Sequence, residues 1–200
     1  MASSTGSHSP VIVVTGTSGA GKGTIERSLL ARMPELELAV SATTRERRPG
    51  ELDGREYWFL SDEEFDRRVR ERAFLEWVTH AWGARAGTLV SEIDRIRAGG
   101  RVPLLDLETE GALRVQRLVP GAFTIFVKAP SFDELERRLR ERATESAGEI
   151  GVRLDVARHQ LELEDAFDYV VVNDDLERAV DEVEAIVRRA LNAAGTMARQ

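Results

Sequence analysis

Short runs of β-branched residues alternate along the chain with stretches of helical period. The run at 11–15, V-I-V-V-T, predicts a buried strand, and residues 24–33 follow with Ile25, Leu29 and Met33 at helical spacing. Further strands are expected at 36–41, 57–60, 73–79, 102–106, 122–129 and 169–173. Further helices are expected at 61–72, 89–98, 131–142, 150–163 and 176–193. This alternation predicts an α/β fold whose parallel sheet carries helices on both faces.

Turn and capping signals divide these elements. Ser61 and Ser131 each stand three residues before a Glu and predict helix N-caps, and Gly99 with Gly100 predicts a helix end. Residues 43–57 are rich in Arg, Gly and Glu without an apolar period, which predicts a loop. Residues 143–148 predict a mobile loop. The strands and helix within 41–90 predict a small α/β insertion.

Composition narrows the possible functions. The chain has 200 residues, enough for one α/β domain, and a net charge of −7, which does not favour a nucleic-acid partner. The absence of cysteine excludes disulfides and thiolate chemistry, and three histidines without a pair at ligand spacing disfavour a histidine metal site. No apolar run is long enough to span a membrane. Residues 1–10 are Ser-rich and lack a signal-peptide core, so we expect a flexible leader and a cytoplasmic location.

Lysine is rare among the cationic residues. Of the 28 cationic residues only Lys22 and Lys128 are lysines, a bias that genome base composition alone can produce. The positions of individual cations therefore carry more information than their number.

A glycine-rich loop follows the first strand. Residues 16–24, G-T-S-G-A-G-K-G-T, nearly match G-x-x-x-x-G-K-[ST], with a strand before and a helix after. Glycines let successive backbone N–H groups surround a phosphate, and the helix N-terminus and Lys22 add positive charge. The hydroxyl comes one residue late, at Thr24, because Gly23 follows Lys22. The sequence predicts an ATP or GTP phosphate site here.

A second group of cations lies in the loop at 43–57. Arg45 and Arg48 can each bind a phosphate through two N–H groups, Ser41 and Tyr57 add neutral donors, and Glu51 can hold an arginine in place. The alternative is an ordinary solvated Arg/Glu loop. The presence of a phosphate loop in the same chain favours a second anion site.

This segment resembles the S-x-T-T-R-x-x-R-x-G-E-x-x-G-x-x-Y-x-F signature of guanylate kinases. The matching residues are Ser41, Thr43, Thr44, Arg45, Arg48, Gly50, Glu51, Gly54, Tyr57 and Phe59. The similarity continues through 74–77, 87–88, Asp106, 138–145, 150–154 and 172–176, and so covers about residues 11 to 190. It implies phosphorylation of GMP by ATP with Mg²⁺.

The resemblance also implies a division of the chain and a set of site residues. The P-loop core would comprise 11–40, 91–137 and 155–195, the GMP-binding insertion 41–90 and the lid 138–154. GMP would be bound by Ser41, Arg45, Arg48, Glu51, Tyr57, Glu76, Thr88 and Asp106. ATP would be bound by Ser18, Gly19, Ala20, Gly21, Lys22, Gly23, Thr24, Arg142 and Asn173. The catalytic cations would be Lys22, Arg45, Arg138, Arg142 and Arg153, and the Mg²⁺ ligands Thr24 and Asp106.

Guanine recognition has a physical basis at Glu76. Guanine presents N1–H and N2–H₂ side by side, and one carboxylate can accept from both groups, whereas adenine has no such pair of donors. Because a buried carboxylate left unpaired is costly, such a contact can discriminate ~10⁴-fold. The competing interpretation of Glu76 is an exposed strand carboxylate.

The chain departs from the family pattern at several positions. Thr17 stands where Pro is usual, Ala86 where a phosphate-binding Tyr is usual, and Ala143 where Gly is usual; Glu108 and Glu110 replace Asp and Gln. Arg85 is a candidate substitute for the missing tyrosine. Two alternatives stay open at this point: a kinase for another phosphorylated sugar or nucleotide, and a protein-binding domain of this type without catalysis. The retained Gly21, Lys22 and Thr24 argue against the second.

Overall fold

A five-stranded parallel sheet forms the centre of the computed structural model, which describes residues 10–80, 83–142 and 147–197. Its strands are β1 (Val11–Gly16), β2 (Leu36–Leu38), β7 (Val102–Asp106), β8 (Ala122–Lys128) and β9 (Tyr169–Val172), in the order β2-β7-β1-β8-β9. All four neighbouring pairs are parallel. The predicted parallel α/β fold is confirmed.

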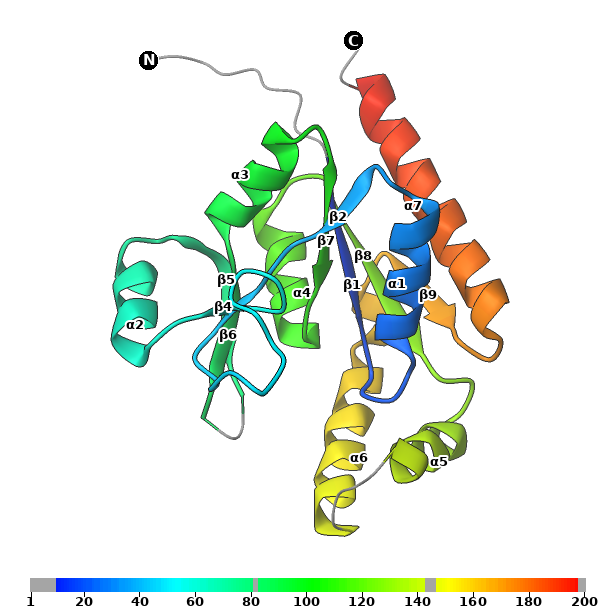
Figure 1. Cartoon of the computed structure of the whole chain (residues 1–200). Helices are drawn as coiled ribbons and strands as arrows, with labels where there is room; N and C mark the ends of the chain where they lie inside the picture. The colour runs from blue at the N-terminus through cyan, green and yellow to red at the C-terminus, as the bar shows by residue number, and fades with distance from the viewer. Residues whose placement is uncertain (1–9, 81–82, 143–146, 198–200) are drawn as a thin grey trace.

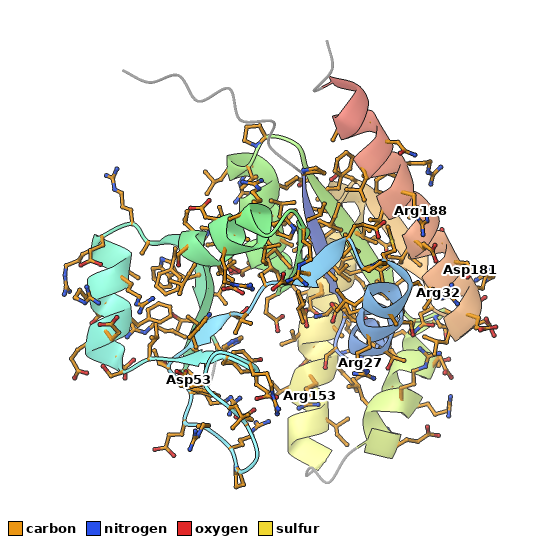
Figure 2. All side chains as sticks on the ribbon, turned by 45° about the horizontal axis from the view of Figure 1, so that its top comes forward. Arg27, Arg32, Asp53, Arg153, Asp181 and Arg188 are labelled. Atoms are coloured by element: carbon orange, nitrogen blue, oxygen red, sulfur yellow. The ribbon has the colours of Figure 1, made fainter. Side chains whose placement is uncertain are left out.

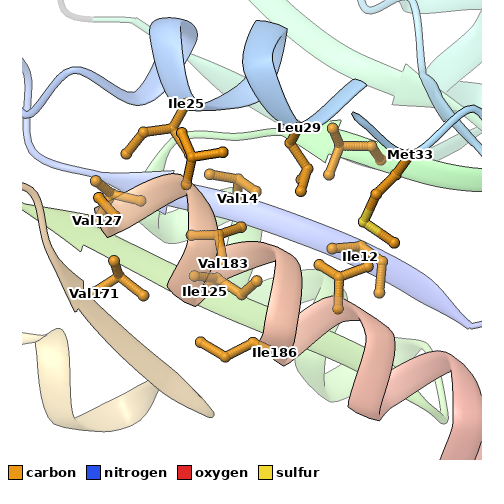
Figure 3. Packing of buried hydrophobic residues seen from close by; sticks show 14 of the residues in the cluster. Ile12, Val14, Ile25, Leu29, Met33, Ile125, Val127, Val171, Val183 and Ile186 are labelled. Atoms are coloured by element: carbon orange, nitrogen blue, oxygen red, sulfur yellow. The ribbon is translucent and has the colours of Figure 1, made fainter. Parts of the chain in front are cut away.

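Helices cover both faces of this sheet (Figure 1). One face carries α1 (Lys22–Arg32) and α7 (Leu176–Met197). Figure 3 shows Ile25 and Leu29 of α1 and Val183 and Ile186 of α7 directed at the strands, where all four are buried. The other face carries α3 (Val90–Ala98) and α4 (Thr109–Leu118). The continuous apolar strands are thus buried on both sides, as parallel sheets require.

A second, four-stranded sheet lies beside the first (Figure 1). It contains β3 (Ala42–Thr43), β4 (Trp58–Phe59), β5 (Phe74–Thr79) and β6 (Arg85–Leu89), in the order β4-β3-β6-β5. The helix α2 (Asp62–Arg70) packs on it through Phe65, whose ring stacks on Phe74 at 4.4 Å between centroids. Pairing in this sheet is mixed: β3 and β4 are parallel, and β6 is antiparallel to β3 and β5.

Two further helices extend from the C-terminal edge of the central sheet. They are α5 (Phe132–Arg142) and α6 (Ala147–Glu162), followed by the short 3-10 turn Glu164–Ala166. Leu135 and Leu139 of α5 pack with Ile150, Leu154 and Ala157 of α6 in a small core of their own. The two predicted N-caps are confirmed, because Ser61 Oγ accepts from Glu64 N and Ser131 Oγ accepts from Glu134 N.

One predicted strand is longer than observed, and two observed elements were not predicted. The strand expected at 36–41 ends at Leu38, and the chain enters the second sheet at Ala42. The strand β6 was not expected, because small residues such as Ala86 and Gly87 give it little apolar signal. The helix α4 was not expected either, although its buried residues Thr109, Ala112 and Val115 stand three residues apart, at helical spacing.

Two predicted segments lie largely outside the residues that the structure describes. Most of the leader and most of the loop expected at 143–148 lie outside the described residues, although Ala147 and Gly148 already belong to α6. None of the described helices is long and apolar enough to cross a membrane.

Candidate active site

The glycine-rich loop joins β1 to α1 at the carboxyl edge of the central sheet. Gly19 and Gly21 adopt left-handed φ values of 87° and 90°, which only glycine adopts without strain. The Asn173 side chain donates to the Ala20 carbonyl at 2.7 Å and lies against Gly21, where a Cβ would collide with its amide. Asn173, which the sequence analysis placed among the ATP-binding residues, supports the loop from the end of β9.

Lys22 begins α1 and contacts the Asp106 carboxylate at the end of β7. Burial lowers the pKa of the Lys22 ammonium, and the nearby carboxylates of Glu26 and Glu108 oppose that shift. Burial raises the pKa of the Glu26 carboxyl, and the charges of Lys22 and Arg27 oppose this rise. Sequence reasoning missed Glu26, because a charged residue on a short helix predicts an exposed position.

The Arg-rich loop is held together by Glu51. Its two carboxylate oxygens accept from the Arg45 guanidinium at 2.8 and 3.1 Å, and Oε2 also accepts from the Arg48 backbone N–H at 2.8 Å. This pairing lowers the pKa of Glu51 and raises that of Arg45. The Arg45 guanidinium also lies 5.2 Å from the centre of the Tyr57 ring. Glu51 therefore fixes the Arg45 guanidinium and the backbone at Arg48, whereas the Arg48 side chain is exposed.

Glu76 is a buried carboxylate on β5. Its side chain is 3% exposed, and its Oε1 accepts from the Thr88 backbone N–H at 2.9 Å and from the Thr88 hydroxyl at 3.0 Å. Burial raises the pKa of Glu76, while the two hydrogen bonds and the charge of Arg114 oppose the rise. The expectation that this carboxylate could be an exposed strand residue is wrong.

One pocket of ≈ 140 Å³ collects residues from both sheets. Five residues predicted for the site line it: Lys22, Ser41, Tyr57, Glu76 and Asp106. Val78, His80, Ala86, Gly87, Leu107 and Glu108 complete the lining. Sequence reasoning singled out Ala86, Gly87 and Glu108 through the family motifs but missed Val78, His80 and Leu107. Strand alternation could have found Val78, because residues 76 and 78 share one face of β5, and His80 follows that strand directly.

Arg85 does not take the place of the missing tyrosine. Its guanidinium pairs with Asp66 at 2.5 Å and Asp62 at 2.7 Å, and it lies 4.5 Å from the centre of the Phe65 ring. These contacts are on the α2 side of the sheet, opposite to the face that carries Ala86. Alternation along β6 explains this placement, because neighbouring residues of a strand point to opposite faces.

The predicted lid arginines lie on α5 and α6. Arg138 donates to the Asn173 carbonyl at 3.1 Å and pairs with Glu134 at 2.7 Å, which brings it close to the phosphate loop. Arg153 projects from α6 (Figure 2). Arg142 ends α5, and its side chain lies outside the described part of the structure.

Oxygen donors for a divalent cation are few. The Thr24 hydroxyl accepts from Arg27 at 3.1 Å, whereas the Asp106 carboxylate is 43% exposed and faces the pocket. Among the described residues no three acidic or His side chains gather at metal-binding distances. This donor set fits Mg²⁺, which commonly takes one or two carboxylates and completes its shell with phosphate oxygens and water.

A parallel sheet with a glycine-rich loop, a lysine at the start of the next helix and a second cationic loop across a pocket defines a P-loop kinase of small phosphorylated substrates. The guanylate kinase family model matches residues 8–190, and the chain belongs to this family.

Individual relatives agree with this assignment. A guanylate kinase of Rubrobacter xylanophilus is 48% identical over 90% of this chain and 93% of its own length. One of Synechococcus elongatus is 44% identical over 88% of this chain and 96% of its own length. The crystal structure of guanylate kinase from Anaplasma phagocytophilum has a TM-score of 0.72 and 27% identity, and covers 92% of this chain and 87% of that one.

Proposed function

We propose that the chain transfers the γ-phosphoryl group of ATP to the phosphate of GMP, giving ADP and GDP. The observation that supports this proposal is the shared pocket, which Glu76, Lys22, Ser41 and Tyr57 all line. The carboxylate would accept hydrogen bonds from the base of the acceptor nucleotide. The lysine would attract the phosphates of the donor nucleotide.

The base of GMP would be read by Glu76 and Thr88. Because the Thr88 N–H and hydroxyl hold Oε1 of Glu76, the carboxylate is oriented before the substrate arrives. An oriented and largely desolvated carboxylate would accept from guanine N1–H and N2–H₂ together. Adenine cannot offer this pair of donors.

The phosphate of GMP would be bound by Ser41, Arg45, Arg48 and Tyr57. Glu51 would hold Arg45 and the Arg48 backbone in place, as its hydrogen bonds suggest, and would not need to touch GMP. Charge-assisted contacts from two arginines are strong and directional. They would also offset the repulsion between the acceptor phosphate and the triphosphate of ATP.

The triphosphate of ATP would be bound by the loop from Ser18 to Thr24, with Lys22 on the outer phosphates. Arg138, Arg142 and Arg153 would approach from the lid, residues 138–154, and Asn173 would border the adenine. Asp106 and Thr24 would hold Mg²⁺ together with the phosphates; the ion supplies charge neutralisation at the phosphate oxygens.

In the reaction, an oxygen of the GMP phosphate attacks the γ-phosphorus of ATP. The bond between that phosphorus and the β,γ-bridging oxygen breaks, and ADP leaves with the electron pair. A monoester phosphate loses its second proton near pH ~6, so at neutral pH the attacking oxygen needs no general base. Lys22, Arg45 and Arg138 would align the two phosphates and stabilise the charge between them. Closure of the lid and of the insertion at 41–90 would exclude water.

A coupled assay with ATP and either GMP, AMP or a ribose phosphate tests this function directly. We expect turnover with GMP that exceeds turnover with the other acceptors by at least ~10³-fold. A thermal shift on addition of GMP is expected alongside it. Turnover of a ribose phosphate in preference to GMP would identify a different kinase, and GMP binding without turnover would identify a binding domain. A cytoplasmic location stays a prediction.

A further inference from the structure

The base-reading carboxylate belongs to the second sheet, but one of its oxygens lies against the core. Oε1 of Glu76 is held by Thr88, within the same sheet. Oε2 faces Gly111 in the first turn of α4, a helix of the core. A Cβ placed on Gly111 would lie 2.8 Å from Oε2 and 3.4 Å from Cδ of Glu76.

Among the residues that the structure describes, only Glu76 would obstruct a side chain at this position. The next heavy atom is Cβ of Leu107 at 3.8 Å, which is an ordinary contact. Gly111 has no left-handed φ, so its backbone does not require glycine. Within a helix, glycine is less favourable than alanine, because it loses more backbone freedom on folding. Gly111 therefore makes the helix less stable than alanine would. In return, it leaves the space that the Glu76 carboxylate fills.

Arg114 lies one turn further along the same face of α4. Its Nη1 donates to the Trp77 carbonyl at 2.8 Å, which ties α4 to β5 at the residue next to Glu76. Its charge also favours the ionised form of Glu76, so it opposes the effect of burial on the pKa of that carboxyl. The pairing of β5 with β6 is irregular between Phe74 and Glu76, which turns this part of β5 locally.

We propose that Gly111 and Arg114 of the core helix α4 are positioning residues for guanine recognition. Gly111 leaves the space in which the Glu76 carboxylate lies. Arg114 fixes β5 on α4 and supplies a positive charge that favours the ionised carboxylate, the form that accepts hydrogen bonds from guanine. The inference rests on the proposed function and goes further, because it places determinants of base specificity in the core, outside the insertion at 41–90.

The test is the ratio of kcat/KM for GMP to that for IMP, which lacks the N2 amine, in wild type and Gly111→Ala. The added methyl group displaces the flexible end of Glu76 and leaves the helix intact, so the protein stays folded with a Tm within a few degrees of wild type. We expect kcat/KM for GMP to fall ~10–100-fold, the GMP:IMP ratio to approach that of Glu76→Gln, and the KM for ATP to stay within about 2-fold.

A matched control is Gly195→Ala in α7, where a Cβ would meet nothing within 4 Å. It makes the same change in a helix far from the pocket and should leave the GMP:IMP ratio unchanged. Arg114→Gln, which keeps a donor for the Trp77 carbonyl but removes the charge, provides a second measurement. It should lower the GMP:IMP ratio ~3–10-fold, and Arg114→Lys should restore most of it.

The possible outcomes separate the inference from the proposed function. A wild-type protein without preference for GMP would contradict the proposed function itself. If Glu76→Gln abolishes the preference while Gly111→Ala and Arg114→Gln retain it, the proposed function stands and the positioning role is wrong. A Gly111→Ala protein that loses activity equally with GMP and IMP would also overturn the inference, because that result describes a general structural role.

Discussion

Lys22 meets Asp106 where the first turn of α1 faces the end of β7. Removal of the ammonium in Lys22→Ala should abolish more than ~99% of kinase activity, because the transition state loses its nearest single cation. The fold should survive, since the core contacts of α1 come from Ile25 and Leu29. The measurement is the steady-state rate together with a thermal melt. A variant with a tenth of the wild-type rate would show that the loop is not the donor site.

The Glu51 carboxylate accepts from the Arg45 guanidinium and from the backbone N–H of Arg48. Arg45→Ala and Arg48→Ala should each raise the KM for GMP ~10–100-fold and change the KM for ATP much less. A charge-assisted contact contributes about 1.5–3 kcal/mol, and each 1.4 kcal/mol is a factor of ten. The exposed Arg47 of the same loop is the control, and Arg47→Ala should leave both constants unchanged. Equal effects on both substrates would exclude an acceptor-phosphate clamp.

Ala86 lines the pocket and pairs with Val78 across the β5–β6 ladder. Because Arg85 points to the other face, it does not replace the tyrosine hydroxyl that the guanylate kinase pattern usually has at this position. Ala86→Tyr should lower the KM for GMP roughly 3–10-fold, about the value of one hydrogen bond. Initial-rate kinetics would check this. An unchanged KM would indicate that another pocket residue, such as His80, already serves the phosphate.

At the scale of elements, one ion pair joins the chain segments that precede α5 and follow α6. Lys128 at the end of β8 donates to both carboxylate oxygens of Glu164 at 2.7 and 2.9 Å, just after α6. Both side chains are about a quarter exposed and line a pocket of ≈ 220 Å³ that Thr17 of the phosphate loop also lines. The pair therefore joins the base of the two helices that carry Arg138 and Arg153.

Lys128→Met should lower kcat ~3–10-fold and leave the KM for GMP nearly unchanged, because the lid arginines lose part of their alignment while the acceptor site is untouched. Glu164→Gln should have a similar effect. The double variant should be no worse than either single one, since residues that act as a pair are not additive. Additive losses in this cycle would contradict the role of the pair.

Sequence alone predicts the elements that carry a strong local signal. The phosphate loop is recognisable because strand, glycines, lysine and helix follow one another within about twenty residues. The N-caps Ser61 and Ser131 are recognisable because each stands three residues before a Glu. The helix α4 and the strand β6 carry weaker local signals. Several of their buried residues are small, and some of these are explained only by what packs against them, such as Gly111 against Glu76.

The candidate site likewise has a part that local sequence patterns predict and a part that depends on tertiary contacts. The motif positions predict which residue types meet a phosphate or a base, and five of those residues line one pocket. What holds each of them comes from distant parts of the chain: Asn173 supports the loop at Ala20, and Arg114 fixes β5 beside Glu76. Such contacts have no local pattern, because tertiary packing alone brings the two residues together.

At the scale of the whole molecule, the arrangement separates donor and acceptor recognition between two sheets. The central sheet carries the phosphate loop, and the second sheet carries Glu76, Thr88 and the Arg-rich loop. A substitution in the second sheet should therefore change the choice of acceptor without changing the binding of ATP. A comparison of acceptors on wild type and on Glu76→Gln tests this directly.

That measurement is the steady-state kcat/KM for GMP, IMP and AMP on both proteins. A carboxamide presents a donor to one of the two guanine donors, which costs on the order of 2–4 kcal/mol relative to the carboxylate. The value for GMP should drop ~30–1000-fold, the values for IMP and AMP should fall much less, and the KM for ATP should stay within a few-fold. A uniform loss across the three acceptors would contradict guanine recognition by Glu76 and leave it a structural carboxylate.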